Sequence, residues 1–279
     1  IHYHANFEYV LFSLRSKKMG FLQGKKILIT GMISSRSIAY GVAKACKEQG
    51  AELAFTYVID KLKNRVLEMT KELGSQLLYR CDVQDDEEIT QLFTNLKEEW
   101  GELDGLLHSI AFADKNSLEG DFLDSINRKS YHLAQDVSAY SLAALAKMAR
   151  PLMKNRQASI VGLTYLGAVR AVPNYNTMGI AKASLEAIIR YTAQALGKDN
   201  IRCNGISAGP IKTLAAAGIS GFDTALKMTA AQSLLKRNVT AEEVGQVAAF
   251  LFSDLSSAIT GEVIYVDAGY RHSAFPMTE

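Results

Sequence analysis

The sequence feature that most constrains the fold is a regular alternation of short apolar runs with amphipathic segments between about Lys25 and Val266. Continuous apolar runs are typical of strands that are buried on both faces of a sheet. Helical segments between successive strands imply crossover connections, and therefore a parallel sheet that is covered by helices on both faces. The sequence thus predicts an α/β fold built on a doubly wound sheet.

Seven apolar runs are candidates for the strands of this sheet: residues 27–30, 53–57, 77–79, 105–110, 159–164, 201–207 and 263–266. Ile38, Val42 and Ala45 recur at helical spacing after the first run, and Gly50 follows where a helix commonly ends. Further helices are predicted at residues 85–99, 138–154, 177–196 and 241–252. We therefore predict a single Rossmann-type sheet of about seven parallel strands with helices on both faces.

The chain of 279 residues is long enough to form one α/β domain around a single core. Residues 1–18 are rich in aromatic side chains and end in a basic run, so we predict an N-terminal extension outside the fold. Two histidines in this extension, His2 and His4, are expected to be solvated rather than to bind a metal. Residues 19–279 are predicted to form a single Rossmann-fold domain.

Charge and cysteine content exclude several classes of partner. The 31 basic and 29 acidic residues give a formal net charge of +2, which predicts binding neither to nucleic acid nor to an anionic membrane. Cys46, Cys81 and Cys203 are far apart in apolar stretches, so neither a disulfide framework nor a zinc site is expected. Apolar runs are too short to span a bilayer, and the first residues lack a signal-peptide pattern. We expect a cytoplasmic protein without a metal site.

Glycine and serine follow the first predicted strand, at the edge of the sheet where doubly wound folds bind ligands. Gly31 permits a tight turn, and Ser37 and Ile38 open the next helix, whose free N–H groups and positive end suit a pyrophosphate. The spacing departs from G-x-G-x-x-G, and glycine is common at such turns in any fold. These residues fit both a dinucleotide site and a purely structural turn.

Other strand ends carry small or polar residues at the same predicted edge. Asp82 and Val83 follow the third strand, Ser109 and Ile110 follow the fourth, and residues 208–211 follow the sixth. Taken singly, Asp82 could cap a helix and Ser109 could form a local hydrogen bond. Their joint position along one edge favours a dinucleotide site.

The choice between NADH and NADPH is left open by the end of the second strand. An acidic residue that would hold the adenine ribose is missing there, since Val58 follows Thr56 and Tyr57. Asp60 comes slightly later, and the basic residues around it could equally meet a 2′-phosphate: Lys61, Lys63 and Arg65.

A tyrosine and a lysine are the candidates for catalysis. Tyr175 and Lys182 are seven residues apart, which on a helix places them on nearly one face and about 10 Å apart along the axis. A neutral tyrosine can donate a proton or a hydrogen bond to an oxygen that becomes negative, while a nearby lysine can hold ribose hydroxyls. A packed tyrosine and a solvated lysine are the alternative, which the small and apolar neighbours of Lys182 disfavour.

The same residues carry a resemblance to the enoyl-acyl carrier protein reductases of the short-chain dehydrogenase superfamily. Tyr175 and Lys182 match that family's Tyr-x6-Lys pattern, and Tyr165 is its second tyrosine ten residues earlier. The Tyr-x-x-x-Lys site of carbonyl-reducing members is absent, because glycines occupy its lysine and serine positions at Gly179 and Gly162. The similarity covers nearly the whole chain after residue 18, including motifs at residues 37–41, 50–57, 108–113, 206–211 and 261–267.

The resemblance implies a reductase of bacterial type II fatty-acid elongation that transfers hydride from NADH to trans-2-enoyl thioesters on acyl carrier protein, and a homotetramer. It implies that Tyr165, Tyr175 and Lys182 are catalytic. Together with the strand-end positions, the expected cofactor contacts are Gly31, Ser37, Ile38, Asp82, Val83, Ser109, Ile110, Lys182, Ile211, Lys212, Thr213, Leu214 and Ala215. The expected substrate contacts are Ala113, Tyr165, Tyr175, Met178 and Phe222.

Three positions depart from the family pattern. Val58 stands where NADH-preferring relatives often carry glutamine, which keeps NADPH open as a cofactor. Val169 replaces a usual glutamate, and Ala268 replaces a glycine. Two other functions fit the same fold: a carbonyl reductase or dehydrogenase, and a catalytically silent dinucleotide-binding regulator.

Overall fold

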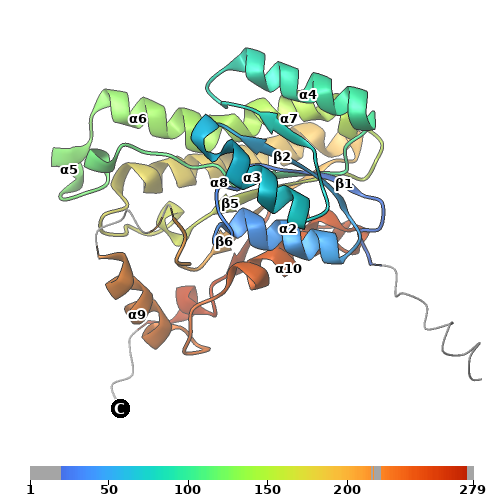
Figure 1. Ribbon diagram of the computed structural model, residues 1–279. Helices are drawn as coiled ribbons and strands as arrows, with labels where there is room; N and C mark the ends of the chain where they lie inside the picture. The colour runs from blue at the N-terminus through green and yellow to red at the C-terminus, as the bar shows by residue number, and fades with distance from the viewer. Residues whose placement is uncertain (1–19, 215, 217–220, 275–279) are drawn as a thin grey trace, which may run out of the picture.

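The computed structural model describes residues 20–214, 216 and 221–274, and it contains a seven-stranded parallel sheet with the order β3-β2-β1-β4-β5-β6-β7 (Figure 1). The predicted fold class and strand count are confirmed. The strands are β1 (Lys26–Ile29), β2 (Glu52–Tyr57), β3 (Leu78–Arg80), β4 (Gly105–His108), β5 (Ser159–Thr164), β6 (Arg202–Ala208) and β7 (Val263–Val266). Their bounds agree with the apolar runs within two residues.

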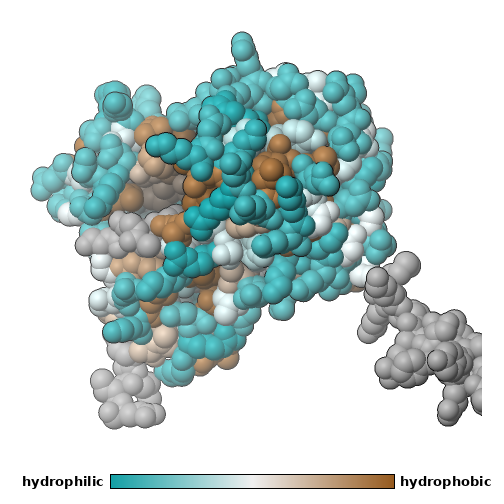
Figure 2. Space-filling view, viewed as in Figure 1, coloured by the Kyte–Doolittle hydropathy of each residue, from teal (hydrophilic) through white to brown (hydrophobic). Residues whose placement is uncertain are grey.

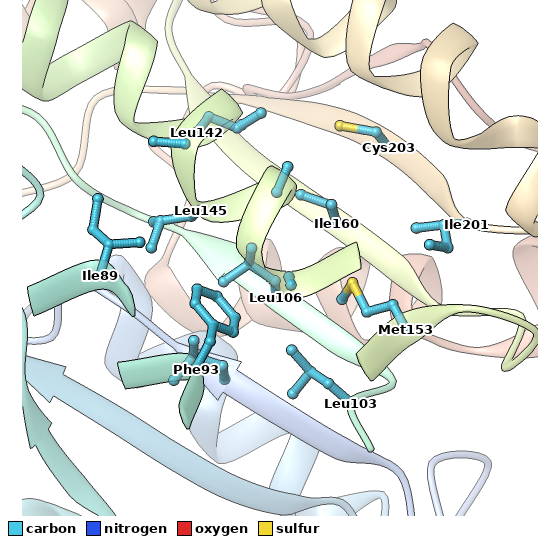
Figure 3. Close-up of a cluster of buried hydrophobic side chains, with 14 of the residues drawn as sticks. Ile89, Phe93, Leu103, Leu106, Leu142, Leu145, Met153, Ile160, Ile201 and Cys203 are labelled. Carbon is cyan, nitrogen blue, oxygen red and sulfur yellow. The ribbon is translucent and has the colours of Figure 1, made fainter. Parts of the chain in front are cut away.

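Helices cover both faces of the sheet, as predicted, and each face has its own apolar core. One core lies beneath α2 (Ile38–Glu48), α3 (Asp60–Glu72) and α10 (Ala241–Phe252). The other lies beneath α4 (Asp86–Trp100), α7 (Ser141–Met153) and α8 (Asn176–Leu196). Figure 3 shows this second core, where Phe93, Leu145 and Leu106 come from a helix, another helix and a strand. Burial on both faces explains why the strands read as continuous apolar runs.

Glycines let α2 and α10 approach each other at backbone distance. A Cβ added at Gly41 would lie 2.3 Å from the carbonyl oxygen of Ala241, and one added at Gly245 would lie 2.3 Å from the carbonyl oxygen of Gly41. Larger residues would push the helices apart and misplace the start of α2. The crossing therefore fixes the position of α2, the first helix after the Gly31 turn.

Several elements were not predicted from the apolar periodicity. They are α3, α5 (Phe122–Ser125), α6 (Arg128–Gln135) and α9 (Phe222–Gln232). The helix predicted at 138–154 begins with a π turn, Asp136–Tyr140, before α7. Most of these segments are largely polar or partly exposed, so their apolar pattern is weak.

Strand order reverses at one point of the sheet, between β1 and β4, while all strands remain parallel. The carboxyl ends of all seven strands therefore lie along one edge, with the crossover helices diverging on opposite faces at that point. The predicted extension, residues 1–18, lies outside the described residues and stays a prediction. Among the described residues, no helix is both long enough and apolar enough to cross a membrane.

Candidate active site

The predicted site residues follow the carboxyl ends of neighbouring strands, so the sheet brings distant parts of the chain to one edge. Gly31 follows β1, Ser109 follows β4 and Tyr165 follows β5 directly. Asp82 follows β3, and Ile211 comes shortly after β6. Because β1 and β4 flank the reversal of strand order, Gly31 and Ser109 stand at its centre.

A close backbone approach explains why glycine stands at position 31. Gly31 has a φ of 78°, and a Cβ there would lie 2.0 Å from the carbonyl oxygen of Ser109. The hydroxyl of Thr30 donates to the carbonyl oxygen of Leu107 at 2.7 Å and accepts from the Ser109 N–H at 3.3 Å. These contacts hold the ends of β1 and β4 together, and only glycine fits at position 31 between them.

The start of α2 fits a pyrophosphate. Ser37 precedes the helix, but its hydroxyl accepts from the N–H groups of Ser34 and Ile33, at 3.1 and 3.3 Å, instead of capping its own helix. The first turn of α2 contains no acidic residue. The positive end of the helix therefore meets the loop without a competing negative charge, which is the arrangement that binds phosphates.

Several expected cofactor residues also have structural contacts of their own. The Asp82 carboxylate accepts from the Gln84 N–H at 3.0 Å, and the Val83 side chain is buried in the core. Ile110 and Ile211 are partly buried and pack against the two cores. Any cofactor contact of these four residues would use the backbone or the remaining exposed surface, and their roles stay predictions.

The segment after β6 is tied to α9 by an ion pair. Lys212 Nζ lies 2.9 Å from Asp223 Oδ1, and both side chains are exposed. The Thr213 hydroxyl accepts from the Ala216 N–H at 3.1 Å, and Leu214 is half-buried. Ala215 lies outside the described residues.

Tyr175 lies just outside the helix that carries Lys182, as the helix predicted at residues 177–196 implied. Helix α8 begins at Asn176, and Tyr175 is the residue just before it, with a φ of −113° and a ψ of −23°. This position turns the tyrosine toward the loop that follows β5. Its ring lies edge to face against the ring of Tyr165, with the centroids 5.0 Å apart and the planes at 70°.

Glycine 167 makes room for the Tyr175 ring. A Cβ at Gly167 would lie 2.5 Å from Cδ1 of Tyr175 and 3.3 Å from Cδ1 of Tyr165. The short turn Leu166–Ala168 in turn rests on α8, since a Cβ at Gly179 would lie 2.9 Å from the carbonyl oxygen of Gly167. Close packing therefore sets the position of both phenols.

Both phenols are held in the neutral form. Burial raises the pKa of Tyr175, and the nearby Tyr165 raises it further. Burial also raises the pKa of Tyr165, with a smaller contribution from Tyr270. At neutral pH each hydroxyl therefore keeps its proton and can donate it in a hydrogen bond.

Lys182 is buried, which excludes the solvated lysine that the sequence left open. Its side chain is 6% exposed, and Nζ donates to the carbonyl oxygen of Leu163 at 2.8 Å. Burial lowers the pKa of Lys182 to about 8, against the opposing effect of Glu186. A buried ammonium with further N–H bonds to donate, beside the end of β5, suits the hydroxyls of a ribose.

Apolar residues lie next to Tyr175. Met178 and Ala181 of α8 form a small buried cluster with Ala134, against which Ala113 and Tyr175 pack. With Tyr165, which packs on Tyr175, the structure thus brings together four of the five expected substrate contacts: Ala113, Tyr165, Tyr175 and Met178. Phe222 is the first residue of α9, and within the described part of the chain it is not a member of this cluster.

Sequence reasoning missed the polar groups that hold these elements in place. The hydroxyl of Ser138, in the π turn, both accepts from the N–H of Phe112 and donates to its carbonyl oxygen, at 2.9 and 3.0 Å. His108 Nε2 lies 2.7 Å from the hydroxyl of Ser141. Burial, then the charge of Lys182, lowers the His108 pKa to about 3, so this histidine is neutral. The only sequence signal for these contacts was the spacing of three between Ser138 and Ser141, which is common in helices and predicts no particular partner.

Comparison with known proteins shows the family of this chain. The family model described as enoyl-(acyl carrier protein) reductase matches residues 31–271. The enoyl-acyl carrier protein reductase (NADH) FabI of Neisseria meningitidis serogroup B is 67% identical over 256 residues, which cover 92% of this chain and 98% of that protein.

Solved structures show the same similarity. The enoyl-acyl carrier protein reductase (NADH) of Aquifex aeolicus aligns with a TM-score of 0.90 and 48% identity, covering 92% of this chain and all of that one. The reductase of Bacillus cereus, solved with NADP+ and indole naphthyridinone, aligns with a TM-score of 0.88 and 45% identity over the same share of this chain. On the family match and these identities, the chain belongs to the enoyl-acyl carrier protein reductase family.

Proposed function

We propose that this protein reduces the carbon–carbon double bond of trans-2-enoyl thioesters with NADH, as the last reductive step of bacterial type II fatty-acid elongation. The observation that supports this function most is the arrangement of two neutral phenols and a buried lysine at the end of β5. The family's catalytic tyrosines and lysine correspond to these three residues.

The chain would hold the cofactor along the carboxyl edge of the sheet. The glycine turn at Gly31 and the uncapped start of α2 fit the pyrophosphate, and Lys182 fits the nicotinamide ribose. When bound, NADH supplies the hydride that adds to C3 of the enoyl chain. The relatives named with NADH favour this cofactor over NADPH. The exposed, uncharged side chain of Val58 does not distinguish between the two cofactors.

The protein's own contribution to the reaction is electrostatic and positional. Tyr175 donates a hydrogen bond to the thioester oxygen, which becomes negative as the double bond is reduced, and so stabilises the enolate. Its raised pKa keeps the proton in place before the reaction. Tyr165, packed edge to face on Tyr175, holds that ring and shapes the pocket. A proton from solvent water then adds to C2 of the enolate, so that one hydride and one proton together saturate the double bond.

The apolar part of the substrate requires apolar surface beside the phenols. Ala113 and Met178 supply it next to Tyr175. Figure 2 shows apolar side chains gathered on the face between α6 and α9. A fatty acyl chain would gain from burial there, whereas a small polar substrate would not.

The test compares trans-2-enoyl and β-ketoacyl thioesters side by side, following oxidation of NADH and of NADPH at about 340 nm. We expect turnover of the enoyl thioester with NADH and little turnover of the ketoacyl thioester. Preferred reduction of the ketoacyl substrate would identify a carbonyl reductase instead. Tight NADH binding without turnover of either thioester would identify the silent regulator.

We further propose that the substrate is delivered on acyl carrier protein in the cytoplasm and that the enzyme works as a homotetramer. The family assignment supports all three statements. Kinetics with acyl carrier protein thioesters against short-chain thioesters test the carrier, because a true carrier lowers KM. Light scattering after size-exclusion chromatography tests the tetramer.

A further inference from the structure

Glu186 is a buried carboxylic acid close to the proposed site, and the mechanism above gives it no role. It lies on α8 one helical turn after Lys182, and it is 6% exposed. Buried carboxylates are rare unless they are paired, because removing their charge from water is costly. We therefore expect the Glu186 carboxylate to have a hydrogen-bond or charge partner.

Two hydrogen bonds tie α8 to consecutive residues of β5. The Thr164 hydroxyl donates to Oε1 of Glu186 at 2.8 Å, and Lys182 Nζ donates to the carbonyl oxygen of Leu163 at 2.8 Å. Tyr165 follows Thr164 directly. The same pair of contacts thus fixes the lysine and the end of the strand that leads into the tyrosine.

Lys182 is a buried cation, and Glu186 is the charged group that acts on it from its own helix. Residues four apart on a helix face each other, so Lys182, Glu186 and Arg190 succeed one another along one side of α8. The charge of Lys182 in turn helps to lower the pKa of the buried His108 of β4, which is therefore neutral. Within the described part of the chain, Lys182 forms no ion pair within 4 Å, and Glu186 is the acidic group that raises its pKa. Burial raises the pKa of Glu186 itself, and the hydrogen bond from Thr164 and the charges of Arg190 and Lys182 oppose that rise. The carboxylate in turn opposes the effect of burial on Lys182.

We propose that Glu186 is a positioning residue for Lys182: its carboxylate, held by Thr164, balances the buried ammonium and keeps it charged at the end of β5. The inference rests on the proposed function, in which Lys182 binds the cofactor ribose. Glu186 itself does not touch the reacting atoms; it acts through Lys182.

The test is the pH profile of kcat/KM for NADH in the Glu186→Gln variant, which keeps the shape and the hydrogen bond to Thr164 but lacks the charge. We expect the alkaline fall of kcat/KM to move to lower pH by roughly one unit or more, the size of shift that one nearby charge produces. A folded Glu186→Gln variant with an unshifted profile would overturn the proposal.

Asp199→Asn is the matched control. Asp199 is a buried carboxylate just after α8 that pairs with Arg150 at 2.6 Å, far along the helix from Lys182. Its loss should lower the melting temperature without moving the pH profile. A purely structural effect of buried carboxylates would appear in both variants.

Thr164→Val keeps the proposal testable if Glu186→Gln fails to fold. Removing the hydroxyl frees the carboxylate, so NADH should bind several-fold more weakly, and Thr164→Ser should restore the affinity. Wild-type affinity in Thr164→Val would contradict the positioning role. Lys182→Ala, measured in parallel, separates the two proposals: wild-type NADH binding there would reject the cofactor role of Lys182, whereas weak binding there with unaltered Glu186→Gln would reject only the role of Glu186.

Discussion

The ring of Tyr175 meets the ring of Tyr165 edge to face, with centroids 5.0 Å apart, although the two residues belong to separate turns on either side of a loop. Edge-to-face pairs are favourable because the positive edge of one ring meets the negative face of the other. Through this contact the Tyr165 ring holds the Tyr175 ring in position. We expect Tyr175 to act on the substrate and Tyr165 to hold the Tyr175 ring in place.

Replacing Tyr175 by phenylalanine should remove the hydrogen bond to the developing enolate. We expect kcat with an enoyl thioester to fall by about 10²–10³, the usual loss for one oxyanion donor. NADH affinity, measured by titration, should stay near wild type because Lys182 is unchanged. Tyr165→Phe should cost less, since the ring contact remains. Full activity of Tyr175→Phe would exclude the role given to this phenol.

An alanine at Gly167 should displace the Tyr175 ring, because its Cβ would lie 2.5 Å from Cδ1. Overpacking of this kind typically costs about 1–3 kcal/mol of stability. Misplacement of the phenol should lower kcat by at least roughly tenfold. Gly197→Ala, where a Cβ meets nothing within 4 Å, is the control and should leave both quantities unchanged. Thermal melts and steady-state kinetics on both variants provide the measurement.

Gly31→Ala should abolish NADH binding and destabilise the fold. Two effects combine there: a φ of 78° and a Cβ only 2.0 Å from the carbonyl oxygen of Ser109. Gly24→Ala separates them, since Gly24 has a φ of 73° but open space around its Cβ position. The control should lose about 1–2 kcal/mol from the left-handed conformation alone and keep NADH affinity. Equal losses in both variants would show that the close approach at Gly31 is unimportant.

NADH binding should weaken as the pH rises through about 8, where Lys182 loses its proton. Tyr175 does not titrate in this range because its pKa is raised, and His108 is already neutral.

Lys182 has the opposite effect on the stability of the fold. The unfolded lysine keeps its proton up to about 10.5, so the unfolded state binds more protons above pH 8, and the contribution of Lys182 to the free energy of unfolding rises with pH. From pH 6.5 to 9.5, NADH titrations should therefore show a falling affinity, while thermal melts should show no loss of stability that is due to Lys182.

The class of fold was determined by the sequence alone because burial on both faces leaves a strong signature. Runs such as residues 27–30 and 159–164 are apolar throughout, and each became a strand within one or two residues. Handedness and connection rules then leave few ways to arrange parallel strands joined by helices. Short or polar elements, such as α5 and α9, left no comparable pattern.

The sequence also predicted which residues belong to the candidate site, but it did not predict how their side chains are arranged. The helix predicted at residues 177–196 is α8, which begins at Asn176, but the sequence did not show that the Tyr175 ring packs against Gly167 and Tyr165. Only the folded sheet decided that Lys182 is buried against β5 and that Glu186 shares its surroundings. Periodicity along a chain reports which faces are apolar, whereas contacts between a helix and a strand depend on which strands become neighbours. That choice belongs to the tertiary structure.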